Sequence, residues 1–534
     1  TVKLTGTTHG TTTDTEGRYR LKNIEEETRR VPSHRVEVSY VGFETAVTVL
    51  EVQSGKTVTL NFRLNQAREE LDEVMVIGQS QSQVIEQKGF SVDAIEIAQF
   101  ENISRDINQI IGATAGVRIR ETGGLGSSFN IFLNGLTGRQ VKFFLDGQPL
   151  ENFGEVFNLN NIPGNLIERV EVYKGVVPVH LGADALGGAV NLISTESLGN
   201  YLDASYSVGS FNTHRANIIG QWRSLSSGLT VKPQFFWNYS DNNYTMNNLE
   251  TATGERGQVI VGNFERFHDS FQSYLGTIEV GFTAVGWADQ LLVGIGYGAL
   301  DREVQTASRG TRASWEPFPF RLPAVGEARQ DEENIRYTLR YQKRDFIVEG
   351  LEFSTYASYN ELKRTSIDTS SNTYNWQGKV VNSQRSTGEF GLPKTQFRFS
   401  QHSLVTNSGL VYQLNERHQF SANYTWSHLD RQGRDTFIAA EDDPFTQPNT
   451  LDKKVVGFSY ELSAFNKKLN TTFLVKYFNL DILAQEARQF EFGQFEVLDL
   501  RTTEERIGYG LATRYDFTDQ WQVKASYEKT YRLP

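Results

Sequence analysis

The sequence predicts a mainly β protein whose largest part is a transmembrane antiparallel β-barrel that begins near Tyr201. From there on, segments of about 9–11 residues alternate apolar and polar side chains, as strands with one lipid face and one lumen face do. The connections between these segments are alternately short and long, which is typical of outer-membrane barrels. No run of about 18 apolar residues occurs, so the sequence contains no candidate membrane helix.

The overall composition narrows the class of function. The chain has 534 residues, a net charge of −11 and no cysteine. An acidic chain lacks the basic excess that neutralises phosphates, so nucleic acid is not expected as a partner. No nucleophile elbow, Walker loop, dinucleotide fingerprint or HExxH motif occurs. We therefore expect no enzyme activity, no cofactor and no metal site.

Residues 1–66 are predicted to form a small β-sandwich. Segments that alternate apolar and polar residues are separated by Gly42 and the Ser54–Gly55 turn. Gly10–Leu21, GTTTDTEGRYRL, and Val38–Glu44, VSYVGFE, resemble the carboxypeptidase regulatory-like domain, in a partial copy without its first strand. A generic β-sandwich spacer accounts for the same strands, so that alternative stays open.

Residues 67–83 are predicted to connect two folded parts. A charged stretch is followed by the β-prone run Leu71–Ile77, and polar residues follow from Gln79 to Gln83. A short β-prone run between a folded module and a polar linker has no strand partner of its own, so its edges are open to pairing with another chain. The alternative is that this run is a strand of the preceding domain.

Residues 84–196 are predicted to form an α/β domain. Val141–Leu145 and Val170–Tyr173 follow a two-residue period and end at glycine turns, which predicts two half-buried strands. Between them and the linker, isoleucines recur at helical spacing behind Ser104, which is placed as the N-cap. The helical pattern ends at Gly112, where a strand pattern resumes.

Val141–Ser194 carries the motifs that point to a family. An ERVEV strand leads to a turn at Lys174–Gly175, and GADALGGAVN follows from Gly182 to Asn191. This order resembles the plug domain of TonB-dependent outer-membrane receptors of the Bacteroidetes type. The resemblance implies that residues 84–196 lie in the lumen of a barrel with about 22 strands. The family's I-R-G turn reads LNG at Leu133–Gly135, so a plug-to-barrel contact through that arginine is not expected.

The same resemblance assigns two sets of binding residues. The run LDEVMVIG that begins at Leu71 resembles the TonB box, which binds TonB of the inner-membrane TonB–ExbB–ExbD complex. Two turn-rich loops of the plug resemble the family's apices, which face the external ligand. The expected TonB-binding residues are Leu71, Asp72, Glu73, Val74, Met75, Val76 and Ile77. The expected ligand-binding residues are Gly124, Ser127, Ser128, Asn152, Phe153 and Phe157.

Residues 197–534 are predicted to form about thirteen barrel strands, with six short periplasmic turns. Long external connections are expected at 241–269, 301–333, 363–397, 432–451 and 486–504. Residues expected to face lipid are Leu202, Tyr206, Leu229, Val231, Phe235 and Trp237. Residues expected to face the lumen are Asp203, Ser205, Thr230 and Lys232. Because a barrel must close in lipid, about thirteen strands predict a C-terminally incomplete copy of the family barrel.

Together these patterns predict a TonB-dependent importer in the outer membrane of a Gram-negative cell, surrounded by lipid and lipopolysaccharide. The expected small-molecule ligand is a scarce nutrient such as a ferric siderophore or haem. One alternative is an importer of glycan or peptide with a surface lipoprotein, which GADALGG disfavours because the SusC type has a YGA-x-x-ANG-like pattern there. Another is a structural or assembly partner that retains the receptor fold. A passive porin is excluded by the plug.

Overall fold

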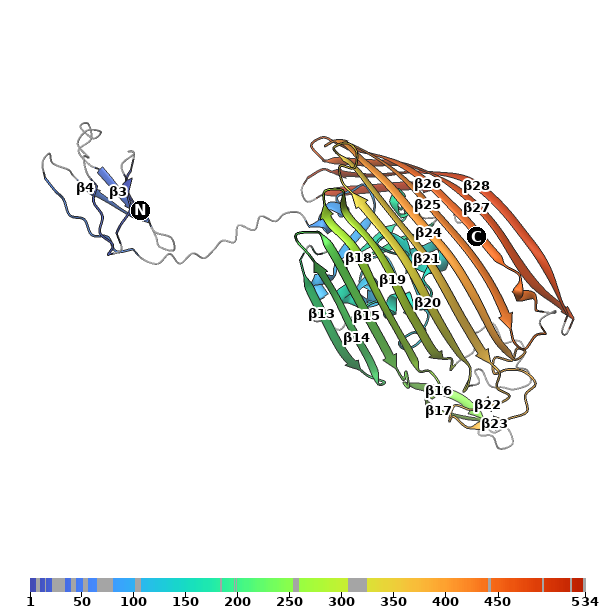
Figure 1. The fold of residues 1–534 in the computed structure, drawn as a ribbon. Helices are drawn as coiled ribbons and strands as arrows, with labels where there is room; N and C mark the ends of the chain where they lie inside the picture. The colour runs from blue at the N-terminus through green and yellow to red at the C-terminus, as the bar shows by residue number, and fades with distance from the viewer. Residues whose placement is uncertain are drawn as a thin grey trace. The chain divides into compact units, whose positions relative to one another are not determined.

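The computed structural model describes residues 1–5, 10–14, 16–21, 34–39, 45–50, 56–64, 80–100, 107–182, 185–195, 197, 199–252, 259–305, 324–439, 443–491, 494–518 and 521–531. The chain divides into two compact units, Thr1–Gly78 and Gln79–Pro534. Both units are drawn in Figure 1. None of the helices in the described ranges is long and apolar enough to cross a membrane.

The first unit contains a four-stranded sheet in the order β2-β1-β3-β4. The strands are β1 Val2–Leu4, β2 Gly10–Thr11, β3 His34–Val38 and β4 Ala46–Leu50. The alternating segments around Val36–Val38 and Val47–Val49 are thereby found as the strands β3 and β4. The stretch Val58–Leu64 has no assigned strand, yet Leu60, Phe62 and Leu64 pack against the core of this sheet. These three residues are half-buried and alternate with exposed ones, so the predicted two-residue period is seen in their burial.

The first helix of the second unit is α1, Gln81–Glu86. Its first three residues fall in the stretch predicted as a polar linker. Ser80 is the N-cap, and its Oγ accepts a hydrogen bond from the Gln83 N–H at 3.3 Å. The Gln83 Oε1 accepts the Ser80 N–H at 3.2 Å, which completes a capping box. Residues 81–83, which were predicted as polar linker, form the first turn of this helix, and the Ser-x-x-Gln spacing marks its start.

The plug contains a five-stranded sheet in the order β10-β9-β12-β11-β5. Its strands are β5 Val92–Glu96, β9 Val141–Leu145, β10 Gln148–Pro149, β11 Ile167–Lys174 and β12 Gly188–Ser194. β12 runs parallel to β9 and antiparallel to β11. Asp146 and Gly147 have positive φ values of 50° and 77°, which suits the predicted tight turn between β9 and β10.

A smaller layer of the plug consists of α2, Ile107–Gly112, beside a three-stranded sheet. The strands of this sheet are β6 Val117–Glu121, β7 Phe129–Leu133 and β8 Leu136–Thr137. The predicted helix is confirmed from Ile107 onward, whereas its predicted N-cap Ser104 lies outside the described residues. The isoleucines at 107, 110 and 111 are buried in the plug core, as their helical spacing predicts.

The barrel part is one antiparallel sheet of thirteen strands, each hydrogen-bonded to its neighbours in chain order, that curves around the plug (Figure 1). Its strands are β13 Tyr201–Gly209, β14 Thr213–Arg223, β15 Leu229–Ser240, β18 Phe271–Val285, β19 Ala288–Glu303, β20 Arg329–Lys343, β21 Leu351–Asp368, β24 Thr395–Asn415, β25 His418–Asp435, β26 Asn449–Ala464, β27 Leu469–Glu491, β28 Gln494–Asp516 and β29 Gln522–Lys529. Two small hairpins lie in the long connections, β16 Thr245–Ala252 with β17 Val259–Glu265, and β22 Thr373–Tyr374 with β23 Val380–Asn382.

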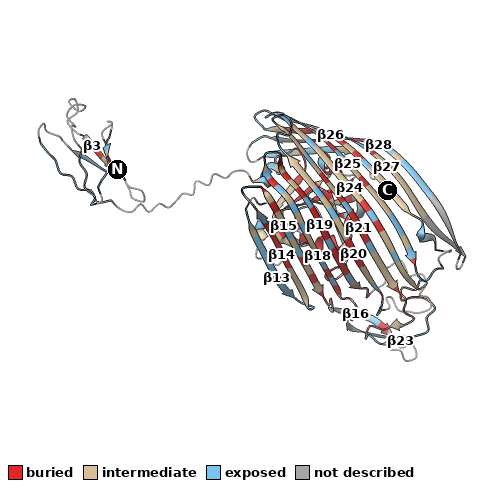
Figure 2. Cartoon of the chain, viewed as in Figure 1, coloured by how far each residue is buried: buried red, intermediate tan, exposed pale blue. Residues whose placement is uncertain are grey.

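The barrel strands alternate between an outer and an inner face, as Figure 2 shows by burial. Leu202 is 75% exposed on the outer face, while its neighbour Asp203 accepts a hydrogen bond from the plug residue Asn165 at 2.9 Å. On β15, the inner residue Asn238 is buried and donates to the plug carbonyl of Asn161 at 3.3 Å. Thr230 and Lys232 share the face of Asn238, so the predicted register of lipid-facing and lumen-facing residues is confirmed.

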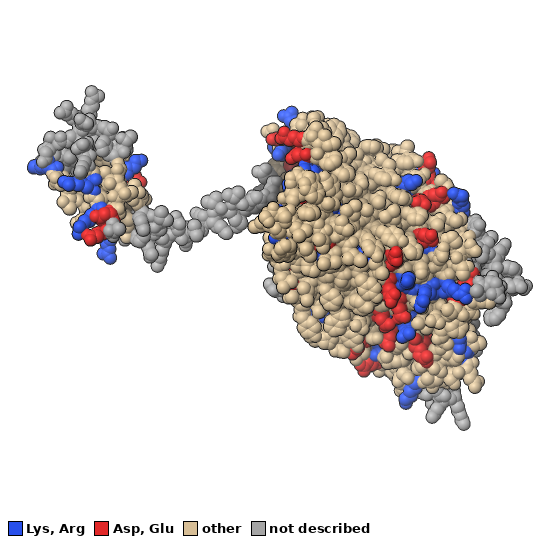
Figure 3. All heavy atoms as spheres, viewed as in Figure 1, with Lys and Arg blue, Asp and Glu red and all other residues tan. Residues whose placement is uncertain are grey.

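Aromatic residues form two levels on the outer face. Toward the long connections, the ring centroids of Tyr274 and Tyr297 are 6.0 Å apart. Aromatic side chains of neighbouring strands lie at the same level. Toward the short turns, Phe282 and Trp287 are 5.6 Å apart. Figure 3 shows a broad part of the outer face without Lys, Arg, Asp or Glu, with charged groups near its upper end and over the strands on the side of the long connections. Such a neutral band between aromatic levels is the signature of a barrel surface in lipid.

The prediction of a long loop at 486–504 is wrong. β27 and β28 stay paired up to Glu491 and Gln494, far beyond the aromatic level that lies toward the long connections. A continued hairpin satisfies the backbone N–H and C=O groups of both segments by pairing them with each other, without any other part of the chain. The alternation of short and long connections therefore holds for the other predicted loops but not for this one.

Candidate functional site at the plug–barrel interface

The plug and the barrel share one apolar core. On the plug side it includes the strands of the five-stranded sheet together with Phe153 and Phe157. On the barrel side, Phe236, Phe271 and Leu275 belong to the same cluster and are almost fully buried. Removing the plug would expose this apolar surface to water, so the plug is held in the lumen by more than polar contacts.

Polar contacts on the inner face of β19–β21 fix one plug segment, and we call the group Glu155, Arg302, Glu332 and Arg364 the Glu155 clamp. Glu332 has a fully buried side chain, whose Oε1 accepts the N–H groups of Glu155 at 2.7 Å and of Val156 at 3.3 Å. Its Oε2 accepts from Arg364 at 2.5 and 2.9 Å. Every oxygen of this buried carboxylate therefore has a donor, as burial of a charge requires.

The carboxylate of Glu155 is also paired with barrel cations. Its two oxygens lie 2.7 Å from Arg302 and 3.1 Å from Arg364. Gly154, which precedes it, has a φ of +79°, and a Cβ there would lie 2.3 Å from the Glu332 Oε1. Only glycine allows the plug backbone to approach the buried carboxylate this closely. The clamp therefore joins η4, Glu155–Phe157, to three consecutive barrel strands.

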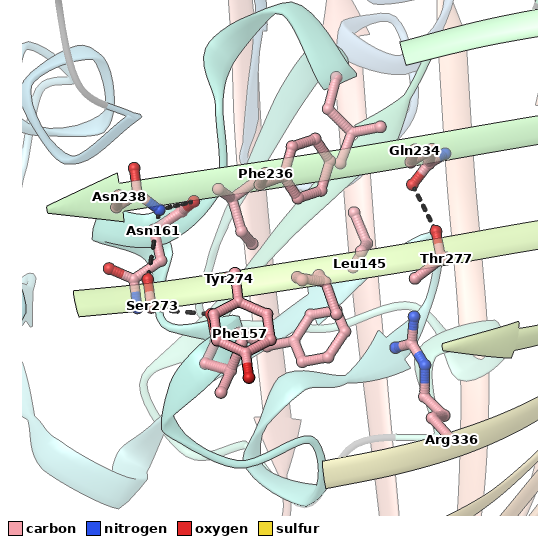
Figure 4. A pocket seen from close by; sticks show the side chains of 14 residues that line it. Leu145, Phe157, Asn161, Gln234, Phe236, Asn238, Ser273, Tyr274, Thr277 and Arg336 are labelled. Atoms are coloured by element: carbon pink, nitrogen blue, oxygen red, sulfur yellow. Dashed lines mark hydrogen bonds between the residues drawn. The ribbon is translucent and has the colours of Figure 1, made fainter. Parts of the chain in front are cut away.

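Arg336, on the same face of β20, stacks on two plug rings. Its guanidinium carbon lies 4.7 Å from the Phe153 ring centroid and 4.2 Å from that of Phe157. Such cation–π contacts stabilise a desolvated cation by about 2 kcal/mol. Figure 4 shows Arg336 and Phe157 beside a small cavity of about 30 Å³, a volume suited to one water molecule. Asn161 lines this cavity, and its Oδ1 has no hydrogen-bond partner in the described part of the chain, so a water there would satisfy it.

A second polar anchor lies on the far strands of the sheet. Lys476 of β27 is buried and donates from Nζ to the plug carbonyl of Val177 at 2.8 Å. It also pairs with Glu528 of β29 at 2.9 Å, and the second Glu528 oxygen accepts the Val177 N–H at 3.4 Å. One lysine–glutamate pair thus satisfies both backbone groups of a single plug residue.

The start of the plug, just after α1, is held by the barrel through its backbone. The Gly89 N–H donates to the Asn470 Oδ1 at 2.9 Å. Arg514 donates to the Gln87 carbonyl at 2.6 Å, and Lys524 donates to the Glu86 carbonyl, also at 2.6 Å. These contacts require no particular side chain on the plug, because they use main-chain atoms only.

The plug loop 122–128 is pinned to the base of a long connection. The Oδ1 of Asn242 accepts the Leu125 N–H at 3.0 Å, and its Nδ2 donates to the Leu125 carbonyl at 2.9 Å. Gly126 has a φ of +77°, and a Cβ there would lie 2.0 Å from the Phe271 ring. The Ser127 Oγ is buried and has no hydrogen-bond partner among the described residues, and Ser128 is exposed. The loop therefore has a fixed backbone and unused polar capacity.

His268 ties together the bases of the long connections at this end. One ring nitrogen lies 2.8 Å from the Ala328 carbonyl, and the other lies 3.2 Å from Glu303. Burial by itself lowers the pKa of His268, but the hydrogen bonds to Glu303 and to Ala328 outweigh it and raise this pKa above the usual range. Glu389 accepts the N–H groups of Gly326, Glu327 and Ala328 at 2.7–2.9 Å, which fixes the same segment.

Comparison with known proteins agrees with this architecture. Residues 85–189 match the model of the TonB-dependent receptor plug domain, and residues 1–76 match that of a carboxypeptidase regulatory-like domain. The chain carries the plug domain of the TonB-dependent receptors. Its arrangement of a plug bound inside a curved antiparallel sheet is that of the receptors whose structures it resembles.

Three relatives illustrate how far the receptor resembles known proteins. The vitamin B12 transporter BtuB of Vibrio vulnificus is 24% identical over 399 residues, which cover 68% of this chain and 63% of the transporter. A TonB-dependent receptor of Formosa agariphila is 32% identical over 200 residues, 36% of this chain and 17% of that protein. The siderophore receptor PiuA of Acinetobacter baumannii superposes with a TM-score of 0.56 at 12% identity, over 82% of this chain and 64% of PiuA. The receptor chain thus spans less than two thirds of these proteins.

The predicted ligand-binding residues of the receptor fall into two places. Gly124, Ser127 and Ser128 lie in the pinned loop, at the end of the sheet that carries the long connections. Phe153 and Phe157 are brought together with ring centroids 5.4 Å apart, but they are only 1% and 5% exposed. The backbone of Asn152 ends η3, Leu150–Asn152. The predicted TonB-binding run Leu71–Ile77 lies outside the described residues.

Sequence reasoning missed the residues that hold the plug of the receptor. The members of the Glu155 clamp come from connections and strands far apart in the chain, and none matches a motif. A signal was present on β20, where Glu332, Asn334 and Arg336 place three polar residues on the lumen face within the barrel. Polar residues facing a lumen are common in barrels, so this pattern alone does not tell a plug contact from a water contact.

Proposed function

We propose that the receptor imports a scarce nutrient across the outer membrane, in a step energised by TonB. One observation carries this proposal: the lumen is filled by a folded plug that shares a core with the barrel and is joined to it by the Glu155 clamp. A passive pore requires an open lumen, whereas a filled one transports only when work moves the plug. That work needs an external partner because the sequence has no nucleotide-binding motif.

We propose that the ligand meets the plug at the loop of Gly124, Ser127 and Ser128. Backbone N–H groups in glycine turns bind anionic groups without a net positive surface, and no described residue forms a hydrogen bond with the Ser127 Oγ. Asn152, Phe153 and Phe157 then act behind the ligand, where burial of both rings links the second apex to Arg336 and the barrel. A displacement of either loop would therefore disturb the contacts between the plug and the barrel.

The proposed ligand is a ferric siderophore or haem. The chain's similarity to a vitamin B12 transporter and to a siderophore receptor supports a metal-containing or metal-binding small molecule. The alternative is an importer of glycan or peptide that works with a surface lipoprotein, and the test below distinguishes the two.

The proposal is tested by growth and uptake with the full-length receptor in a deletion strain. We expect the deletion to slow growth on ferric siderophore or haem as the iron source and to leave growth on defined glycans unchanged. An uncoupler should abolish accumulation of radioactive iron without abolishing surface binding. Ser128→Trp should weaken surface binding about tenfold by filling the apex, whereas Ser226→Trp, in a short turn at the other end, should not. A growth defect confined to glycans or peptides would contradict the ligand class.

A further inference from the structure

The lipid-facing side of the sheet has a groove near its short turns. It has a volume of about 610 Å³ and crosses five adjacent strands, β21, β24, β25, β26 and β27. None of the described residues that line it is charged. The walls and floor include Leu410, Tyr412, Phe420, Ala422, Phe458 and Phe473. A volume of this size lies within the range of about 300–1,000 Å³ that is typical of ligand-binding pockets.

The register of the sheet explains why a groove forms at this place. Leu410 of β24 lies directly opposite Ala422 of β25, which in turn lies opposite Phe458 of β26. Residues opposite each other share a face, and Leu410 and Phe458 are exposed on the outer one. In the row below, Phe420 lies between Tyr412 and Tyr460. Ala422 is thus a small side chain with larger ones around it, and it forms the floor of the groove.

The groove ends at the membrane–water interface. The rings of Phe420 and Tyr460 are 5.1 Å apart, and the hydroxyl of Tyr460 lies 2.8 Å from the Nδ1 of His418. Aromatic rings with a polar tip occupy the headgroup level of membranes. The two turns beyond them, which join the strands of the groove, expose the cations Arg417, Lys467 and Lys468. Within the described residues, none of these three side chains has an ion-pair partner.

We propose that this groove binds one acyl chain of a phospholipid, whose phosphate is held by the turn cations. An uncharged, apolar lining at membrane depth suits a hydrocarbon chain, and cations at its interfacial end suit the phosphate to which that chain is linked. The phospholipid belongs to the leaflet that meets the short turns. The site lies on the outer face of the sheet, so it is separate from the plug apex and does not depend on the proposed nutrient.

Native mass spectrometry of the full-length receptor, titrated with phosphatidylglycerol in detergent, tests the proposal. The wild-type receptor should retain one phospholipid more tightly than all others. Ala422→Leu and Ala422→Phe, which fill the floor, should weaken this first binding step about tenfold, because contact with about two methylene groups is lost. Ala357→Phe is the matched control, since Ala357 lies on β21 opposite Thr406 and outside the lining.

The cations provide a second, independent measurement. Replacing Lys467 and Lys468 with glutamine should weaken phosphatidylglycerol binding and reduce its dependence on salt, while the groove itself is unchanged. Equal lipid retention in the wild type and both Ala422 variants would overturn the proposal. A second copy of the chain or another protein that is released from the receptor by Ala422→Phe, in place of lipid, would overturn it as well. Unchanged unfolding temperatures of the variants establish that the barrel is intact.

Discussion

At the scale of single residues, the plug is held by buried charged side chains whose oxygens and N–H groups have hydrogen-bond or ion-pair partners. Glu332 illustrates this, because its carboxylate is surrounded by two plug N–H groups and by Arg364. A buried charge without partners costs several kcal/mol, so each member of the Glu155 clamp depends on the others. Gly154 is part of the same arrangement, since a side chain there would meet the carboxylate.

Glu332→Gln tests this dependence. The amide oxygen can replace one acceptor, but the amide N–H₂ faces Arg364, which leaves that guanidinium with Glu155 alone. We expect a loss of about 2–3 kcal/mol in the free energy that holds the plug, which is typical for a hydrogen-bonded buried charge. The rate at which trypsin cleaves the plug of the folded receptor measures it. Glu333→Gln is the control, because Glu333 is the exposed neighbour on the outer face, and an equal effect of both variants would contradict the prediction.

At the scale of elements, the long connections are organised at their bases. The Gln305 side chain accepts the N–H groups of Phe267 and His268 and donates to the Val325 carbonyl at 2.6 Å. Together with Glu389 and His268, it joins segments from three connections. Charged and amide side chains replace the strand ladder where the chain leaves the sheet, because the backbone groups there still need partners.

The contacts of His268 with Ala328 and Glu303 make the structure at the bases of the long connections sensitive to pH. Its pKa is raised in the folded receptor, so protonation stabilises the loop base fully below the unfolded value of about 6.5, and this stabilisation is lost as pH rises through the folded pKa. We expect protection of the Gly326–Ala328 amides from deuterium exchange, corrected for intrinsic rates, to fall over that pH range. In His268→Gln, which keeps a side-chain donor but does not titrate, the profile should be flat. A wild-type profile as flat as that of the variant would contradict the role of His268.

At the scale of the whole molecule, import requires a force that reaches the plug. The first plug segment after α1 is held through backbone atoms by Asn470, Arg514 and Lys524, and the second half by the Glu155 clamp and Lys476. The predicted TonB box, Leu71–Ile77, precedes all of these contacts in the chain. A pull on it would act first on the main-chain contacts of residues 86–89.

Proline substitutions test the coupling segment. Strand addition uses backbone N–H groups, and proline removes one donor and fixes φ. Val74→Pro and Val76→Pro should therefore abolish accumulation of ligand and leave surface binding in the same cells nearly unchanged. Val74→Ala, which keeps the donor, should accumulate normally. Normal accumulation in both proline variants would mean that the segment is only a linker, and loss of binding as well would mean that it belongs to the fold.

The sequence by itself determined the architecture of this receptor. A period of two residues distinguishes the lipid face from the lumen face, because one face meets hydrocarbon and the other meets polar groups, and β13 and β15 follow it. Glycine turns and the ERVEV strand likewise located β9 and β11. These features are local, so each can be read within one stretch of chain. Where local signals compete, as at the tall hairpin of β27 and β28, the prediction was wrong.

Only the tertiary structure decided which residues hold the plug and where the predicted apex residues lie. The hydrogen bond from Glu155 to Glu332 joins residues 177 positions apart, and it forms only if β20 has its observed register beside β19 and β21. A shift by one residue would turn Glu332 toward lipid. The same long-range packing buries Phe153 and Phe157 under Arg336, although their polar, asparagine-rich surroundings in the sequence suggest an exposed loop. Contacts of this kind depend on pairs of distant segments, and a single sequence does not state which segments meet.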